Sequence, residues 1–215
     1  MKKTLVHPTY FGSIAQFVAL SQAEKVCFEV NDNYQKQTYR SRQYIYGANG
    51  RLLLNIPVKH NKSNAGKQKY KDIKIEDSFK WQLNHWRSLE TAYRTSPFFE
   101  YYEDEFIYLY EKPFDFLLDF NFECLKALSE CLQLDLDFSQ QTTSYQLPEE
   151  IDHTKILDVR TLVNAKKEPK FNFSTYEQVF NDKYGFLSNL SALDLLFNEG
   201  PNALTYLESQ LLEFS

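Results

Sequence analysis

Three residues of this chain have side chains that could move or steer a proton: His7, His85 and Asp194. A histidine titrates near neutral pH, so a neutral imidazole can take a proton from an amine or a hydroxyl group. Asp194, one turn after Ser191, could orient a histidine or an amine. These residue types predict a group transfer with His7 or His85 as the general base. The alternatives are a structural histidine beside Trp81 for His85 and a buried helix anchor for Asp194.

The polar segment 35–42, QKQTYRSR, supplies groups that could hold an anionic substrate. Lys36 and Arg42 could bind a phosphate or a carboxylate, and a guanidinium can do so through two parallel hydrogen bonds. Tyr10 and Tyr39 could stack on the acceptor or form a hydrogen bond with it. We therefore expect these four residues to contribute to substrate binding.

The first 30 residues predict the unit that must position His7. Residues 4–6 are an apolar run typical of a buried strand, residues 7–12 break it with Pro and Gly, and Ser13 can cap a helix. Residues 25–30 predict a second strand, parallel to the first. In such sheets ligands bind at the carboxyl ends of the strands, and the free N–H groups of a helix start favour an anion. The sequence therefore predicts a site at the loop that carries His7.

The same topology brings the segment 35–42 toward His7. If the first two strands are parallel neighbours, this segment leaves the sheet at the same edge as the His7 loop. It carries three cations in seven positions, Lys36, Arg40 and Arg42. The mechanism depends on whether His85, from a later helix, also reaches this edge.

The rest of the chain predicts a hairpin and then helices. An Asn-Gly pair at residues 49–50, between two strand-like runs, is a strong hairpin signal. Later segments predict helices, at residues 77–93, 113–132, 156–163 and 190–198. We predict an α/β (or α+β) fold over residues 1–215 as one domain. An N-terminal strand–helix–strand unit and the hairpin would share one mixed sheet, followed by a mostly helical C-terminal half.

Composition excludes several classes of protein. The chain has 215 residues and a formal charge of −5, which argues against a general nucleic-acid binder. A basic run between Lys59 and Lys74 could hold a phosphate, and the alternative is a solvated loop. Three cysteines without paired spacing argue against a disulfide framework and a zinc site, so we expect a cytoplasmic protein. Neither a signal peptide nor a membrane span is predicted, and no metal or cofactor is expected.

Two blocks near the N-terminus resemble those of the WbqC-like protein family. That family begins with a strand, a Gln-Pro-x-Tyr-x-Pro loop and a helix, and residues 7–17, HPTYFGSIAQF, are similar to it. Its second block has a Lys followed by an aromatic-x-Asn-Arg signature, which Lys36, Tyr39 and Arg42 match. Ser41 stands where that signature usually has Asn.

Two later blocks extend the resemblance over most of the chain. The third motif is W-x-x-x-H-x-x-S-(I/L)-x-x-A-Y, and its matches are Trp81, His85, Ser88, Leu89, Ala92 and Tyr93. The fourth is a Leu-Ser-(I/A)-Leu-Asp-Leu-Leu-Phe-Asn-x-Gly block at residues 190–200. We count Ser88 and Tyr93, from the third block, among the candidate substrate-binding residues.

The chain also departs from the family pattern. His7 replaces the usual Gln before Pro8, and Gly12 replaces the second Pro, so a role that needs the Gln amide would change here. Residues 135–155 have no clear counterpart.

The resemblance implies a role in the synthesis of surface polysaccharide (O-antigen), in a family described as possible transferases. With the residues above, it predicts a transferase that acts on a small-molecule substrate. The donor would be an activated sugar, nucleotide-linked or amino, or an acyl or aminoacyl donor. The alternatives are a non-catalytic sugar-binding or scaffold protein and a nucleotidyltransferase-like enzyme.

Overall fold

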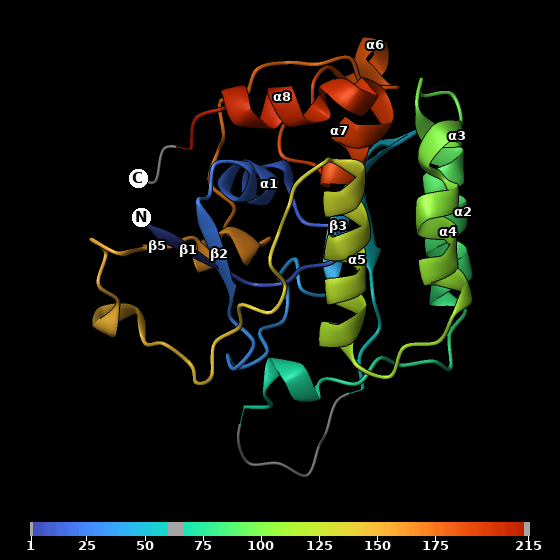
Figure 1. Ribbon diagram of the computed structural model, residues 1–215. Coiled ribbons are helices and arrows are strands. Elements are labelled where there is room, and N and C mark those ends of the chain that lie inside the picture. Colours follow the sequence, from blue (N-terminus) through green and yellow to red (C-terminus); the bar gives the residue numbers. More distant parts are fainter. Residues whose placement is uncertain (1, 60–66, 213–215) are drawn as a thin grey trace.

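The computed structural model describes residues 2–59 and 67–212, and a small parallel sheet lies on one side of the molecule (Figure 1). The strand order is β2-β1-β5, formed by β1 (Lys3–Val6), β2 (Lys25–Phe28) and β5 (Ile156–Asp158). In the register of the sheet, Leu5 of β1 pairs with Cys27 on one side and Asp158 on the other. Helix α1 (Ile14–Ser21) connects β1 to β2. The predicted strand–helix–strand unit and its parallel pairing are confirmed.

The predicted hairpin forms a sheet of its own. Strands β3 (Arg42–Gly47) and β4 (Gly50–Asn55) pair antiparallel, with Gly47 opposite Gly50. The α/β class is confirmed, but the hairpin does not join the first sheet as we expected. Both edges of β1 are occupied, and the outer edge of β2 is paired at Phe28, whose N–H donates to the Gln140 carbonyl at 2.8 Å. The parallel sheet therefore offers the hairpin no edge at these positions.

The prediction of a short helix at residues 156–163 is wrong. Its first half is strand β5, and only the second half is helical, as the 3₁₀-helix η3 (Arg160–Val163). The N–H of Val159 donates to the Leu5 carbonyl at 3.0 Å, and the N–H of Lys3 donates to the Lys155 carbonyl at 2.8 Å. Strand β1 thus imposes the extended conformation on a segment too short for its own pattern to define.

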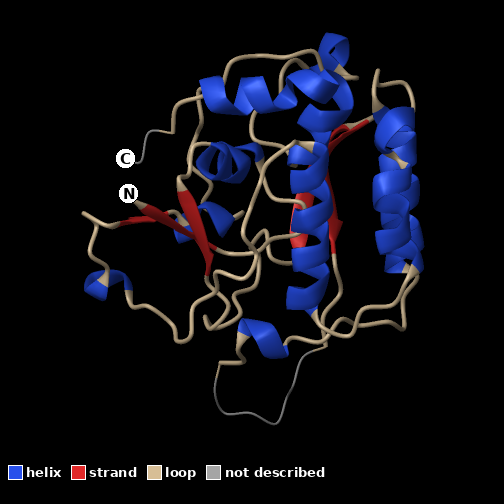
Figure 2. Cartoon of the chain, in the orientation of Figure 1, coloured by secondary structure: helices blue, strands red, loops and turns tan. Residues whose placement is uncertain are grey.

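Most of the helices follow the hairpin, as predicted (Figure 2). The α-helices that follow the hairpin are α2 (Trp81–Tyr93), α3 (Phe99–Tyr102), α4 (Asp104–Glu111), α5 (Leu117–Cys131), α6 (Asn181–Tyr184), α7 (Ala192–Glu199) and α8 (Ala203–Ser209). Short 3₁₀-helices lie at η1 (Tyr70–Asp72), η2 (Pro148–Glu150) and η4 (Gly200–Asn202). Figure 1 shows α2, α3 and α4 together on one side of α5, with the parallel sheet on the other. Among the described residues, no helix combines the length and the apolar character that a membrane span needs.

The many aromatic residues of this chain chiefly build its core. Phe197 of α7 packs against Tyr93, Phe99 and Phe106, with ring centroids 5.0 to 5.8 Å apart. Phe11, in the loop after β1, packs edge-on against Phe106 at 5.6 Å. These contacts join the N-terminal unit to the helices, so the aromatic content reflects packing rather than an exposed stacking surface.

The backbone of Gly200 lies so close to the ring of Phe98 that a substitution there tests the packing of the core. A Cβ added to Gly200 would lie 2.6 Å from the ring of Phe98, and the backbone there has φ = +52°. Gly185 has φ = +71°, but a Cβ there would meet nothing within 4 Å. We expect Gly200→Ala to lower the free energy of unfolding by about 2–4 kcal/mol, and Gly185→Ala by about 1–2 kcal/mol from backbone strain alone. Urea denaturation measures both, and equal losses would contradict the steric argument.

Candidate functional site

Charged side chains gather where the three parallel strands end. Because β1, β2 and β5 run in the same direction, their carboxyl ends meet at one edge of the sheet. His7 follows β1, Asp32 follows β2, and Asp158 ends β5. We call the residues at this edge the carboxyl-edge cluster: His7, Glu29, Asp32, Arg40, Asp158 and Arg160. Five of them are buried within the protein and Asp158 nearly so, which is unusual for so many ionisable groups.

His7 lies between a carboxylate and a guanidinium. Its Nε2 is 2.6 Å from Nη2 of Arg40 and 3.1 Å from Oδ2 of Asp32, and the same Nη2 donates to that Oδ2 at 2.5 Å. A guanidinium keeps its protons, so Nε2 must accept from Arg40, and we assign the imidazole proton to Nδ1. This Nδ1 is buried and has no hydrogen-bond partner among the described residues. His7 therefore presents one unsatisfied ring nitrogen at the sheet edge.

The surroundings keep His7 neutral. Burial lowers the pKa of His7 to about 4, and the positive charge of Arg40 acts in the same direction, while Asp32 opposes both. Burial alone would raise the pKa of Asp32, but the Arg40 guanidinium, 2.5 Å from Oδ2, holds that pKa well below the usual range. At neutral pH the site thus holds a neutral imidazole beside a charged Asp32–Arg40 pair.

Several elements converge to hold Arg40, whose side chain is only 1% exposed. Its Nη1 donates to the Asn33 carbonyl at 3.0 Å, and its guanidinium lies 5.1 Å from the ring centre of Tyr70. Asn121 of α5 donates to the Arg40 carbonyl at 2.6 Å, and the Tyr70 hydroxyl donates to the Pro8 carbonyl at 2.9 Å. The loops after β1 and β2, η1 and α5 are therefore all fixed around this one side chain.

The other arginine of the cluster is already matched by carboxylates. Arg160 donates from Nε and Nη2 to the two oxygens of Asp158 at 2.9 and 2.8 Å, and from Nη1 to Glu29 at 3.3 Å. The ring of Tyr145 lies 5.3 Å from its guanidinium. Arg160 therefore ties β5 to the end of β2. Over residues 2–59 and 67–212, no group of three His, Cys, Asp or Glu side chains is placed to hold a metal ion.

His85 belongs to a different network. Its Nδ1 lies 2.9 Å from the hydroxyl of Tyr10, which is in turn 2.9 Å from the hydroxyl of Tyr110. Its ring packs edge-on against Trp81, with centroids 5.2 Å apart, and burial lowers the pKa of His85 to about 4. Tyr10 is itself buried in the core. The structure shows no hydrogen-bond partner common to His85 and His7 among the residues it describes.

Asp194 lies in a third buried network. It accepts hydrogen bonds from the hydroxyls of Tyr93 at 2.7 Å and Tyr176 at 2.5 Å, and from Nε2 of Gln178 at 2.8 Å. Burial raises the pKa of Asp194, while these donors oppose that shift. The three predicted proton-handling residues are thus each placed in a separate network.

The predicted substrate-binding residues do not all lie together either. The buried Tyr39 donates its hydroxyl to Glu168, which also accepts from Asn189 at 2.6 Å. Ser88 donates to the Asn84 carbonyl at 2.8 Å on the outer side of α2. In contrast, the two predicted cations, Lys36 and Arg42, line one open hollow of about 490 Å³.

The predicted anion site at the start of α1 is wrong, because the chain itself occupies it. The N–H of Ile14 donates to the Leu190 carbonyl at 3.0 Å, and the N–H of Ala15 donates to Oδ1 of Asn189 at 2.7 Å. Ser13 is buried and forms no side-chain cap, so the segment before α7 satisfies the helix start instead.

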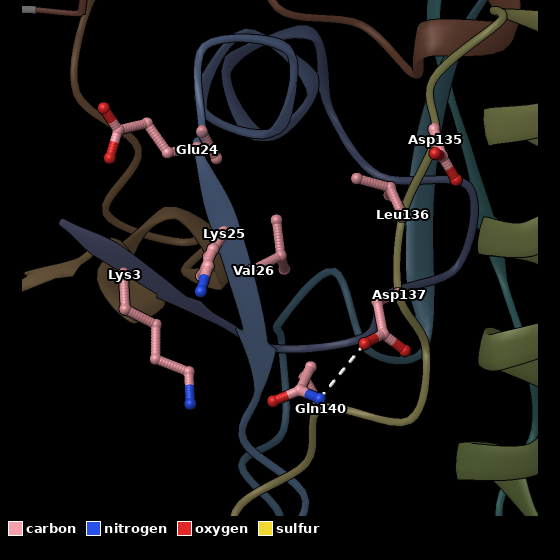
Figure 3. Close-up of a pocket in the computed structure, with 9 residues that line it drawn as sticks. Lys3, Glu24, Lys25, Val26, Asp135, Leu136, Asp137 and Gln140 are labelled. Carbon is pink, nitrogen blue, oxygen red and sulfur yellow. Dashed lines mark hydrogen bonds between the residues drawn. The ribbon is translucent and has the colours of Figure 1, made fainter. Parts of the chain in front are cut away.

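A second hollow, of about 530 Å³, lies at the opposite edge of the sheet, where β1 and β2 begin (Figure 3). Lys3 and Lys25, which pair in register, line it together with Glu24, Asp135 and Asp137. Its charges have both signs, and it is lined by none of the residues that the sequence predicts for the site. We therefore place the candidate site at the carboxyl edge.

Sequence reasoning missed Asp32, Glu29 and Arg160 as site residues. Asp32 stands in a turn directly after a predicted strand, and that position was a usable signal for the carboxyl edge. Arg160 could not be found, because its segment was assigned to a helix. Arg40 was one of three cations in the segment 35–42, and the pattern did not distinguish the one that turns inward.

The buried histidines make stability depend on pH. The folded pKa values of His7 and His85 lie below the ordinary value of 6.5, so between about pH 6.5 and 4 the unfolded chain binds more protons. Stability should therefore fall as the pH falls through this window, by about 2 kcal/mol per histidine at pH 5. Urea denaturation at pH 7 and 5 measures the loss. His7→Gln and His85→Gln should each reduce it, whereas a change at the exposed His153 should not.

The charge of Arg40 should be visible in the titration of His7. Replacing Arg40 with Gln removes a positive charge that lowers the His7 pKa and leaves Asp32, which raises it. We expect Arg40→Gln to move the His7 pKa from about 4 toward 6.5, measured by NMR titration of the imidazole Cε1 proton. Arg42→Gln, in the hollow, serves as the control and should leave the value unchanged. A His7 pKa that stays near 4 in Arg40→Gln would show that burial alone sets it.

Comparison with known proteins adds a family. The model of the WbqC-like protein family matches residues 7–168, which include all of the carboxyl-edge cluster and exclude Asp194. No curated protein and no solved structure matches the chain. Since the match covers most of its length, the chain belongs to the WbqC-like protein family.

Proposed function

We propose that this protein is a transferase that passes a group from an activated donor to an amine or hydroxyl group of a small acceptor. The donor would be a nucleotide-linked or amino sugar, or an acyl or aminoacyl donor. The observation that carries the proposal is the buried, neutral His7, held between Asp32 and Arg40 at the carboxyl edge of the sheet. Its Nδ1 has no partner in the part of the chain that the structure describes. Perturbed ionisable groups at such an edge are typical of active sites.

The role of His7 follows from its two ring nitrogens. In this proposal the imidazole changes tautomer when the substrates bind, so that Nε2 donates to Oδ2 of Asp32, 3.1 Å away. The proton then resides on Nε2, and Nδ1 carries a lone pair. As the acceptor attacks the donor, its proton passes to Nδ1, and the leaving group departs with the electrons of the broken bond. The negative charge of Asp32 stabilises the imidazolium that forms.

The other predicted residues take different roles in this proposal. Asp194 with Tyr93, and His85 with Tyr10, hold the core through buried hydrogen bonds. Lys36 and Arg42 remain available to bind the donor, and Tyr39 fixes the loop that follows β2. Ser88 lies outside the site.

The resemblance to a family from gene clusters for surface polysaccharide supports a role in O-antigen synthesis. Activated sugar donors of that kind are used in the cytoplasm, where we place the reaction.

Two substitutions at one position test the role of His7. Gln can donate a hydrogen bond but cannot take a proton at neutral pH, and it is the residue that the family usually has there. If His7 is the base, both His7→Ala and His7→Gln should lower kcat by about 100-fold or more, since general base catalysis contributes about 10²–10⁴. Turnover of nucleotide sugars, aminoacyl donors and acyl-CoAs is the measurement.

His85→Gln is the matched control, because it changes an equally buried neutral histidine. It should lower stability and leave the kcat of the folded enzyme within a few-fold of the wild type. If His7→Gln kept full activity and His7→Ala did not, His7 would act as a hydrogen-bond donor and not as the general base. A failure to turn over any donor class, with measurable sugar binding, would favour a non-catalytic binding protein instead.

A further inference from the structure

The open hollow beside β3 and β4 is a cationic surface on an acidic protein. It has a volume of about 490 Å³, within the range of small-molecule sites, and is lined by Lys36, Arg42 and Lys59 with one carboxylate, Glu76. The whole chain carries a formal charge of −5. A local excess of positive charge on such a chain favours an anionic ligand.

Two of these cations are not committed to a carboxylate. Among the residues that the structure describes, neither Lys36 nor Arg42 forms an ion pair, and Arg42 donates only from Nε to Oδ1 of Asn55 at 3.3 Å. Lys59 pairs with Asp77 at 3.0 Å. The two arginines of the carboxyl-edge cluster, in contrast, are bound to acidic side chains. The outer nitrogens of Arg42 are thus available for a bidentate contact with a phosphate.

An aromatic ring borders the same hollow. Phe79 lines it and is 65% exposed, which is uncommon for so large an apolar side chain. An exposed ring beside two cations that form no ion pair with the described residues offers a stacking face for a planar base next to a binding place for phosphate. A neutral sugar alone would leave both cations unused.

Two residues that line the hollow are sequence neighbours of the residues that form the Arg40 site. Ser41, which lines it, directly follows Arg40, and Tyr34, also in the lining, follows Asn33, whose carbonyl accepts from Arg40. The Tyr34 hydroxyl donates to Ser41 at 2.9 Å.

We propose that this hollow binds the nucleoside-diphosphate part of the donor, with the diphosphate on Lys36 and Arg42 and the base against Phe79. The transfer of a group from this donor rests on the proposed function. The binding of the nucleoside diphosphate is inferred from the residues that line the hollow. It selects a nucleotide-linked donor from the classes proposed above.

Isothermal titration calorimetry with UDP, pyrophosphate and uridine tests this inference on the full chain. We expect UDP to bind more tightly than pyrophosphate, and uridine weakly. Arg42→Gln and Lys36→Gln should each raise the Kd of UDP by about tenfold or more, since each removes a charge-assisted contact with phosphate. Phe79→Ser should weaken UDP and leave pyrophosphate unchanged. Arg87→Gln, at an exposed arginine of α2 outside the hollow, is the matched control and should change nothing.

Either of two results would overturn the inference. One is that neither UDP nor pyrophosphate binds saturably, and the other is that Arg42→Gln and Arg87→Gln weaken the binding of UDP equally. His7→Gln distinguishes this inference from the proposed function, because it should leave the Kd of UDP unchanged while turnover is lost. UDP binding in the hollow without any transfer would contradict the proposed function alone. Transfer that is indifferent to Arg42→Gln and Lys36→Gln would contradict the inference alone.

Discussion

The buried charge of Arg40 is the constraint on which the candidate site depends. A guanidinium cannot lose its proton, so burying it is costly unless its N–H groups find acceptors. Asp32, His7 and the Asn33 carbonyl supply acceptors for its two terminal nitrogens, and the ring of Tyr70 covers one face. Its Nε is buried and has no hydrogen-bond partner among the described residues. The requirement explains why the loops after β1 and β2 adopt one fixed arrangement and why His7 stays neutral beside an acidic residue. Removing one partner would leave an uncompensated charge, at a cost of about 3–5 kcal/mol.

Local patterns and one topological rule were enough to place His7. The apolar run before it, the Pro and Gly after it and the second strand predict parallel pairing, and parallel pairing puts His7 at the carboxyl edge. The same reasoning brought the segment 35–42 to that edge. It could not separate Arg40, which is buried, from Arg42, which lines the open hollow. That difference depends on Asp32 and Tyr70, which reach Arg40 only through the fold.

The errors share one cause, which is pairing with distant segments. Strand β5 is extended because β1 has a free edge, and nothing within residues 156–158 specifies this. The start of α1 is closed by Asn189 and Leu190, so an anion site that looked open from local sequence is filled. Asp194 looked available for catalysis because its hydrogen-bond donors, Tyr93 and Tyr176, come from other parts of the chain.

The place of β5 in the sheet also has a consequence for how the protein folds. Residue 3 pairs with residue 156, so one edge of the first strand waits for a partner from the last third of the chain. Closing so large a loop costs conformational entropy before any contact repays it, and such contacts form late. During synthesis on the ribosome, β1 and β2 would emerge long before Asp158 and Arg160. The charged edge of the sheet would therefore be completed only after β5 has emerged, and a nascent chain would carry an exposed strand edge until then.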